Sequence, residues 1–294
     1  MLEDFVFVWY NNGCKKGLLL SLMLSLPLYI INGILGLTLG SYLNSWIWSR
    51  SRRDGTRDPR FGASQIGKRY FRRSQCVHCG QELTWQENIP LVSFIFLLGR
   101  CRTCHKKIPL DYFFVELAMS LGFLGLVYYH LHAPALIPIQ LFRDLFFFAL
   151  LIVVFVYDLK YYLILSGVVW GGAVIAFAVN YFFLGFSLYS LVLGMAVGGG
   201  FFMLQYIISR GRWIGGGDVR LGVMMGALLA WPNILAALFI SYILGALVAV
   251  PLLLLKKKGL SSQIPFGTFL SVGTLVAMLW GSQIVLWYRA LVGL

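Results

Sequence analysis

LGVMMGALLAWPNILAALFISYILGALVAVPLLLL, the stretch from Leu221 to Leu255, contains no charged side chain. It is 35 residues long, whereas about 20 apolar residues are enough to cross a bilayer. Proline lacks an amide donor and disfavours helix at the preceding residue, so Trp231-Pro232-Asn233 should break the run. The stretch therefore predicts two membrane helices, the first of them short.

Comparable apolar runs fill most of the remaining chain of 294 residues. Of its side chains, 59% are hydrophobic and 12% are charged, and its mean hydropathy is +0.80. Soluble domains carry roughly 45–50% apolar and about 25% charged residues, so a soluble globular or a disordered protein is excluded. The sequence predicts an all-α polytopic membrane protein with about eight transmembrane helices. The other six runs are Leu18–Ile47, Phe113–Tyr129, Leu141–Tyr157, Leu163–Phe183, Leu188–Ile208 and Phe269–Trp287.

The distribution of positive charge predicts the orientation in the membrane. Thirteen of the 24 Lys and Arg residues lie between Arg50 and Lys107. Loops on the cytoplasmic side are enriched in Lys and Arg. If both termini lie outside, 20 of the 24 positive charges lie inside, and we therefore expect this orientation.

Four of the five cysteines form two CxxC pairs, Cys76-x-x-Cys79 and Cys101-x-x-Cys104, separated by 21 residues. Two such pairs can complete the tetrahedral shell of four thiolates that zinc prefers in structural sites. Because this shell leaves no position open for water, we expect a structural zinc ion in a cytosolic loop domain.

Other interpretations of the cysteines stay open at this stage. The four residues could form two disulfides or remain free thiols, although disulfides are rare in the reducing cytosol. His78 and His105 stand beside the cysteines and could replace one ligand. The fifth cysteine, Cys14, lies outside both pairs and is expected to be a thiol.

A basic segment, residues 49–75, carries nine Lys or Arg residues against two acids. It is expected to lie against anionic lipid headgroups, with a contact to a substrate leader as an alternative. Nucleic acid is not an expected partner, because aromatic residues are not interleaved over most of the segment. The predicted division is residues 1–48 for the N-terminal segment and first transmembrane helix, 49–110 for the cytosolic basic and zinc-binding domain, and 111–294 for the remaining transmembrane domain.

Two carboxylates are candidates for chemistry at the membrane surface. Asp158 ends an apolar run, and Asp218 follows Gly215-Gly216-Gly217, 60 residues further on. The predicted topology brings both to the cytosolic face, where an ionisable residue in an apolar segment suggests a function. Two such carboxylates share a proton, so one can act as a base toward water and the other as an acid toward a carbonyl.

The three glycines before Asp218 remove side chains and widen the backbone conformations available, so an extended peptide could lie close to the acid. The alternative is that the acids are interfacial anchors, with Asp158 paired to Lys160 and Asp218 paired to Arg220.

Two further acids lie in apolar runs. Glu116 is expected to cap or pair at the membrane interface, or to line a cofactor site. Asp144, next to Arg143, is expected to anchor the outer face.

An ordered series of short motifs runs along the chain. In chain order they are Gly40-Ser41-x-x-Asn44, Cys76-x-x-Cys79, Asn88-Ile-Pro-Leu-Val-Ser-Phe94, Gly99-Arg-Cys-Arg-x-Cys104, Val115-Glu116-Leu117, Asp158-Leu-Lys, Gly215-x-Gly217-Asp218-Val-Arg-Leu and Pro265-Phe-Gly-Thr-Phe269. With these motifs the chain resembles bacterial type IV prepilin leader peptidases, membrane aspartyl proteases of the GxGD type. It departs from the family pattern at Leu165-Ser166, where a Pro-Asp pair is usual, and at Arg220, where Lys is common.

The resemblance implies that Asp158 and Asp218 are the catalytic pair of an endopeptidase in the bacterial inner membrane. Such enzymes remove the leader of prepilins and pseudopilins in type IV pilus and type II secretion systems, on the cytosolic side of the substrate's hydrophobic helix. Many also methylate the new N-terminus with S-adenosylmethionine. No glycine-rich nucleotide fold is visible in this sequence, so the residues themselves do not establish methylation.

Two other function classes remain as alternatives. A proton-coupled transporter would use the acids as proton carriers, but it predicts internal repeats, which the sequence lacks. A zinc-ribbon scaffold of a pilus or secretion assembly would leave the glycines before Asp218 unexplained. The partners expected on the leading hypothesis are prepilin and pseudopilin substrates and the lipid bilayer.

Overall fold

The computed structural model describes residues 2–53, 75–76, 78–133, 137–255 and 264–293. Most of the predicted basic segment, residues 54–74, and the Lys256–Lys258 triplet lie outside the described residues. The predictions made for them, including their side of the membrane, therefore stay predictions.

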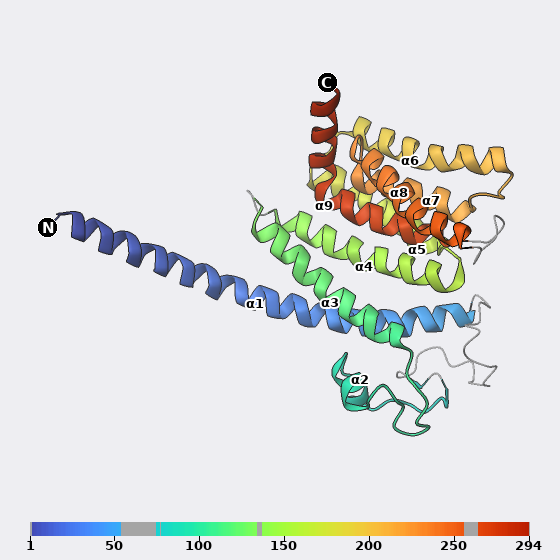
Figure 1. The fold of residues 1–294 in the computed structure, drawn as a ribbon, viewed down its shortest axis with the longest axis horizontal. Helices are drawn as coiled ribbons and strands as arrows, with labels where there is room; N and C mark the ends of the chain where they lie inside the picture. Colours follow the sequence, from blue (N-terminus) through green and yellow to red (C-terminus); the bar gives the residue numbers. More distant parts are fainter. Residues whose placement is uncertain (1, 54–74, 77, 134–136, 256–263, 294) are drawn as a thin grey trace. The chain divides into compact units, whose positions relative to one another are not determined.

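The described chain is helical, apart from two isolated β-bridges in the cysteine region, Gln75 to Glu82 and Arg100 to Lys107. Figure 1 labels its principal helices in chain order. The elements are α1 (Leu2–Arg53), the 3₁₀-helix η1 (Gln86–Asn88), α2 (Val92–Phe96), α3 (Leu110–Leu131), α4 (Pro138–Tyr161), α5 (Ser166–Ala178), the π-helix η2 (Val179–Phe183), α6 (Leu188–Ser209), α7 (Gly216–Leu229), α8 (Asn233–Leu254) and α9 (Phe266–Val292).

Seven helical segments in the described residues are long and apolar enough to cross a membrane, which confirms the polytopic all-α fold. They lie in α1 (Leu26–Ser51), α3, α4, α5 with η2, α6, α8 (Asn233–Leu252) and α9. The predicted break at Trp231-Pro232-Asn233 is also confirmed, because α7 ends at Leu229 and α8 begins at Asn233. The eighth predicted helix is α7, whose 14 residues rise only about 21 Å. It is shorter than a hydrocarbon core of about 30 Å, as the prediction of a short helix required, and is therefore not among these seven.

The chain forms two compact units, and the first combines Met1–Asn44 with Ile66–Leu136. In it, α1 and α3 cross closely at two glycines. A Cβ at Gly36 would lie 2.7 Å from the backbone oxygen of Met119, and one at Gly40 would lie 2.8 Å from the Cα of Glu116. The carboxylate of Glu116 accepts a hydrogen bond from the backbone N–H of Leu91 at 2.9 Å, which ties the cysteine region to α3.

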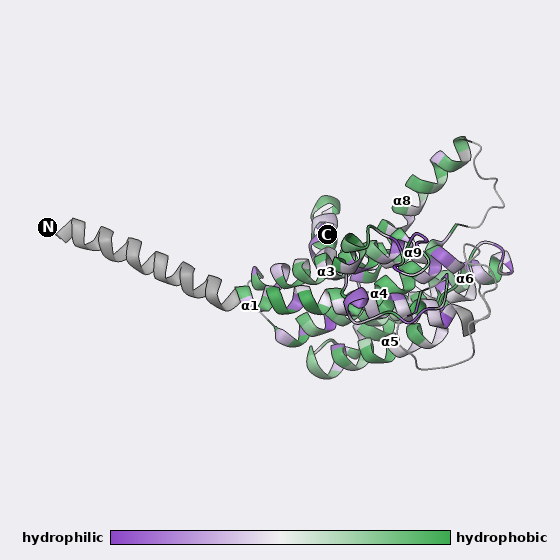
Figure 2. Cartoon of the chain, turned by 90° about the horizontal axis from the view of Figure 1, so that it is seen from below, coloured by the Kyte–Doolittle hydropathy of each residue, from purple (hydrophilic) through white to green (hydrophobic). Residues whose placement is uncertain are grey.

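The second unit, Ser45–Gln65 with Ile137–Leu294, contains α4 to α9. Its core is apolar, and Phe202, Leu221, Met224 and Ile234 are fully buried there. Large apolar side chains are also exposed on these helices, and much of their ribbon has the hydrophobic colour in Figure 2. Exposed apolar surface of this extent indicates contact with lipid.

Candidate functional site

Asp158 lies in the last turn of α4 with only 5% of its surface exposed. Its Oδ2 accepts a hydrogen bond at 3.1 Å from the backbone N–H of Thr268, in the first turn of α9. The first N–H groups of a helix lack partners within the helix, so they are natural donors to a carboxylate. The start of α9 therefore fixes the orientation of Asp158.

Gly267 allows α9 to approach Asp158 this closely. A Cβ at this position would lie 2.9 Å from Oδ2 of Asp158 and 3.0 Å from Cδ1 of Ile164. Any larger residue would have to displace the carboxylate or the isoleucine.

Asp218 occupies the first turn of α7 and is 8% exposed. Its Oδ2 accepts a hydrogen bond at 3.1 Å from the backbone N–H of Gly215, the N-cap of the helix. Tyr242 of α8 interacts electrostatically with Asp218 and donates a hydrogen bond from its hydroxyl to Oε1 of Gln205 at 3.0 Å. Each of the two buried aspartates thus binds a backbone N–H at the start of a helix.

The two carboxylates share one site. Asp158 and Asp218 interact electrostatically. The side chain of Ile164, in the segment between α4 and α5, packs against the first turns of both α7 and α9. A Cβ at Gly217 would lie 2.9 Å from Cβ of Ile164, and one at Gly267 would lie 3.0 Å from its Cδ1. The tertiary structure therefore brings the two predicted aspartates together, as the topology prediction required.

Of the two reasons predicted for the glycines before Asp218, absence of side chains and backbone freedom, the structure uses only the first. Positive φ angles occur at other glycines, and not at Gly215, Gly216 or Gly217. What the structure requires at Gly217 is space, because the side chain of Ile164 packs against it. The proposed approach of a peptide to this loop stays a prediction.

The sequence left open a pairing of Arg220 with Asp218 at the membrane interface. The hydrogen bond that Arg220 makes in the structure is to another residue. The guanidinium of Arg220 donates a hydrogen bond to the hydroxyl of Ser166, at the start of α5. Ser166 and Arg220, two residues at which the chain departs from the family pattern described above, are therefore in contact. Their hydrogen bond joins α7 to α5 near Asp218.

Sequence reasoning did not assign roles to Ile164, Gly267 and Thr268. Gly267 and Thr268 belong to the Pro265–Phe269 motif, which was noted only as a resemblance. The motif could have indicated the role of Gly267, because a glycine at the start of a membrane helix suggests that another part of the chain packs closely against it. No local pattern marks Ile164.

An apolar groove of about 530 Å³ opens beside Asp158. Thr268, whose N–H binds Asp158, and Leu159, the next residue along α4, both line it. The remaining walls come from α4, α8 and the start of α9 and include Phe155, Leu247 and Val248. The groove therefore reaches Thr268, the residue whose N–H binds Asp158, although neither aspartate lines it, and it presents hydrocarbon to whatever enters it.

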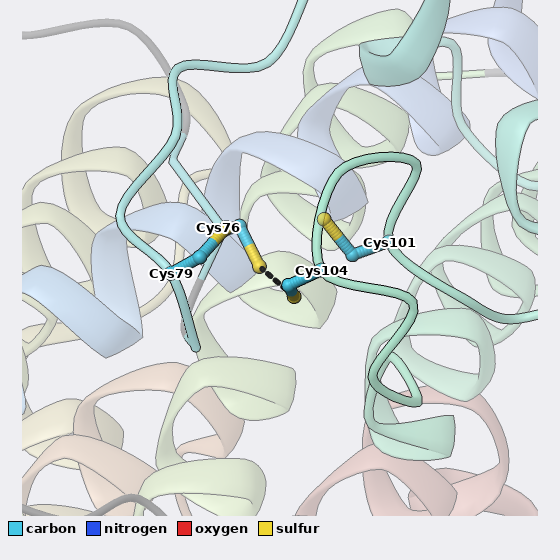
Figure 3. A group of neighbouring side chains, drawn as sticks. All are labelled: Cys76, Cys79, Cys101 and Cys104. Carbon is cyan, nitrogen blue, oxygen red and sulfur yellow. Dashed lines mark hydrogen bonds between the residues drawn. The ribbon is translucent and has the colours of Figure 1, made fainter.

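The four predicted metal-binding cysteines converge in the first unit (Figure 3). Their sulfur atoms all lie within 4.8 Å of one another, and Sγ of Cys76 is 3.9 Å from Sγ of Cys104. In a tetrahedral shell with Zn–S bonds of about 2.3 Å, neighbouring sulfurs are about 3.8 Å apart. The cluster therefore fits a metal ion after a small contraction. All four residues are thiols, so the predicted alternative of disulfides does not hold.

The two CxxC loops have the same backbone design. The N–H of Gly80 donates to the oxygen of Cys76 at 2.9 Å, and the N–H of His105 donates to the oxygen of Cys101 at 3.0 Å. Gly80 and His105 both have positive φ, 74° and 54° respectively, which turns each loop back after its second cysteine. His78, the alternative ligand, has its Nε2 3.2 Å from the backbone oxygen of Lys107.

The thiols of the cluster differ in acidity. Burial raises the pKa of the Cys76 thiol to about 12. Although burial acts in the same direction on Cys101, the backbone N–H groups of Cys104 and Thr103 lower the pKa of that thiol to about 7. A bound cation would allow all four sulfurs to be thiolates together.

Two family models match this chain. Residues 34–130 match the bacterial Peptidase A24 N-terminal domain, and residues 145–250 match the type IV leader peptidase family. The first match contains the cysteine cluster, and the second contains both aspartates.

Several curated proteins named prepilin leader peptidase/N-methyltransferase are similar to this chain. One from Pseudomonas putida is 29% identical over 88% of this chain and 93% of its own length. One from Aeromonas hydrophila is 31% identical over 74% of both chains, and one from Legionella pneumophila is 34% identical over 74% of this chain and 76% of its own. No solved structure matches.

Proposed function

The chain belongs to the type IV prepilin leader peptidase family, and on that premise we propose that it is an aspartyl endopeptidase that removes the leader peptide of prepilins and pseudopilins. The observation that carries the proposal is the pairing of Asp158 and Asp218, two buried carboxylates that interact and are each held by a backbone N–H. The relatives' name, prepilin leader peptidase/N-methyltransferase, supports prepilins as the substrate class.

In the proposed reaction, the two carboxylates hold one water molecule and share one proton. The ionised carboxylate takes a proton from the water as its oxygen attacks the carbonyl carbon of the scissile peptide bond. The protonated carboxylate gives its proton to the carbonyl oxygen, which forms a tetrahedral intermediate. Collapse of the intermediate breaks the C–N bond, and the nitrogen leaves as an amine after accepting a proton from the dyad.

The apolar groove supports a position for the substrate. We place the hydrophobic segment of the prepilin in the groove lined by Leu159, Leu247 and Thr268, because apolar side chains leave lipid for a protein groove without losing polar contacts. The scissile bond, at the polar end of that segment, would then lie at Asp158. A photo-crosslinking residue at Leu247, in the Asp218→Asn variant, tests this position. It should capture a prepilin, and the same residue at Ile207, an exposed position on α6, should not.

The charges of the second unit support the proposed orientation. Lys160 and Arg220 lie at the helix ends that carry the aspartates, the end of α4 and the start of α7. Arg210 and Arg212 lie in the segment that leads from the end of α6 to α7. Positive residues mark the cytosolic side. We therefore place the dyad at the cytosolic face of the bacterial inner membrane, in a multi-pass protein. With α7 counted as a short eighth crossing, both termini lie outside.

We assign a structural zinc ion to Cys76, Cys79, Cys101 and Cys104, whose soft thiolates suit that metal and whose sulfurs fill a four-coordinate shell. The ion would fix the fold of the loop domain and take no part in peptide cleavage. The division into residues 1–48, 49–110 and 111–294 is retained as a proposal for the functional parts.

The relatives' names also include N-methyltransferase, and we propose methylation of the new N-terminus as a second activity. Among the described residues, none forms the glycine-rich turn between strand and helix that is typical of nucleotide-binding folds.

Incubation of the purified full-length protein with a type IV prepilin, followed by mass spectrometry, tests the proposal. Leader removal that depends on Asp158 and Asp218 is the expected result. A mass increase of the new N-terminus only when S-adenosylmethionine is added would support the second activity. An inactive wild-type protein that is correctly inserted and metal-loaded would overturn the peptidase proposal in favour of the scaffold or transporter.

A further inference from the structure

A buried ionic network lies at the opposite ends of the two helices that carry the aspartates. Arg143, near the start of α4, is 7% exposed, its neighbour Asp144 is 1% exposed, and Asn180 of the π-helix η2 is fully buried. From the sequence, Asp144, next to Arg143, was expected to be an anchor at the outer face. They instead form part of the interior.

The hydrogen bonds of this network link α4 to α7. Nε and Nη2 of Arg143 both lie 2.8 Å from Oδ1 of Asp144, and Nη1 of Arg143 donates to Oδ1 of Asn180 at 2.8 Å. Nδ2 of Asn180 then donates to the backbone oxygens of Ala227 and Leu228, at 2.8 and 2.9 Å.

The last carbonyls of a helix lack partners within the helix, and lipid supplies none. Asn180 provides partners for two of these carbonyls at the end of α7. It faces inward from a π-helix, an irregularity that is frequent at functional sites. The buried side-chain atoms of Arg143, Asp144 and Asn180 all have hydrogen-bond partners.

The geometry points to a positioning role for this network in the proposed reaction. Leu228 is ten residues from Asp218, so α7 is a rod of about 15 Å between the network and one aspartate. Asp144 is 14 residues from Asp158, which gives about 21 Å along α4. We propose that Arg143, Asp144 and Asn180 fix the relative depth of α4 and α7, and thereby the separation of the two carboxylates.

α4 and α7 pack mainly against other helices, α4 against α9 and α7 against α5 and α6, which explains why such a tie is needed. Between the two ends, Leu150 of α4 and Met224 of α7 meet over Gly172 of α5, where a Cβ would lie 2.8 Å from each side chain. Methyl and thioether groups can slide past one another with little loss, whereas hydrogen bonds to a buried charge have one geometry. Buried ionic groups are best attested as devices that set register, and their net contribution to stability is small.

Asn180→Asp distinguishes the hydrogen bond to Arg143 from the hydrogen bonds to the carbonyls of α7. The new carboxylate can still accept from Arg143, but it has no donor for the carbonyls of Ala227 and Leu228. The matched control is Asn233→Leu, which removes the 3.2 Å hydrogen bond from Asn233 of α8 to Ser282 of α9 and lies outside the network. Arg143→Lys is the second test variant, because lysine offers a single charged group in place of the guanidinium fork.

Two measurements on the full chain in lipid nanodiscs test the inference, which rests on the proposed function. For leader removal from a prepilin, Asn180→Asp and Arg143→Lys should lower kcat by about 10²-fold with KM unchanged, because a displacement of about 1 Å has this effect on reacting groups. By hydrogen-exchange mass spectrometry, both variants should accelerate exchange over residues 215–220. Asn233→Leu should leave kcat and this exchange unchanged.

Wild-type kcat in the inserted variants, or unchanged exchange over residues 215–220, would overturn the inference. So would an equal loss of kcat in Asn233→Leu, which would make the network a source of general stability only. If wild-type protein removes no leader, the proposed function fails, and the exchange data still decide whether the network is coupled to the first turn of α7.

Discussion

Asp158 and Thr268 lie 110 residues apart in the chain, and the backbone N–H of Thr268 donates a hydrogen bond of 3.1 Å to Oδ2 of Asp158. The contact joins the end of α4 to the start of α9 and makes α9 part of the carboxylate site. Gly267 permits it, because a side chain there would meet the carboxylate.

Gly267→Ala should therefore reduce leader removal by about 10²-fold or more, since the new methyl group would lie 2.9 Å from Oδ2 of Asp158 and displace it. Gly171→Ala is the control, because a Cβ there meets no atom within 4 Å. The measurement is the initial rate of leader removal at equal amounts of inserted protein. Equal rates in the two variants would show that the approach of α9 does not position Asp158.

Asp158→Asn and Asp218→Asn should each abolish leader removal. General acid–base catalysis contributes about 10²–10⁴-fold, and loss of the shared water should add to this. The double variant should be scarcely slower than either single variant, as expected for groups that act as a unit. The Glu variants should also be strongly impaired, because an added methylene moves the carboxyl group. Rapid leader removal by inserted Asp218→Asn would contradict the mechanism.

Cys104→Ser should lower the zinc content of the purified protein and destabilise the loop domain, because metal binding and folding are coupled in such small sites. Cys14→Ser, outside both CxxC pairs, should retain a full complement of metal. Elemental analysis and thermal unfolding, with and without a chelator, measure both effects. Zinc-free wild-type protein, prepared without chelator, would argue against the metal site.

Gly222→Ala should destabilise the second unit, although alanine normally stabilises a helix by about 0.5–1 kcal/mol relative to glycine. A Cβ at Gly222 would overlap the backbone oxygen of Gly198, where α6 and α7 cross. Gly200→Ala, two residues along α6 from this crossing, meets no atom within 4 Å and should be neutral or stabilising. Thermal unfolding in detergent should thus give shifts of opposite sign for the two variants.

The loop domain should lose stability in acid through Glu87. The backbone N–H and hydroxyl of Thr84, at 2.8 and 2.9 Å, and the charge of Arg102 lower the pKa of this carboxyl, although slight burial opposes them. Its contribution is present above the unfolded-state pKa of about 4.3 and is lost as the pH falls through the lower folded-state value. Hydrogen exchange over residues 84–88, corrected for the intrinsic effect of pH, should show this loss in wild type. Glu87→Gln should show a smaller pH effect, and an equal pH effect in both proteins would rule out this origin.

Local sequence properties were sufficient to predict the membrane helices and the cysteine cluster. A span depends on the length and apolarity of one continuous segment, so the boundaries of α3, α4 and α6 followed from hydropathy within a few residues. The break before α8 followed from Pro232 alone. The CxxC spacing predicted the convergence of four sulfurs. The two cysteines of each pair lie in a single turn of chain, so only the contact between the two pairs is long-range.

The sequence alone determined that this is a polytopic helical membrane protein with four clustered cysteines and two acids at its helix ends. Only the tertiary structure decided which distant groups meet: Thr268 with Asp158, Ile164 with Gly217, Ser166 with Arg220, and Arg143 with Asn180. The physical reason is that hydropathy and spacing act within one segment, whereas these contacts depend on how helices rotate and slide against one another. Close packing at Gly198 and Gly222 fixes part of that arrangement. The spacings Gly194-x₃-Gly198 and Gly222-x₃-Gly226 indicate close packing, but they do not say which helix meets which.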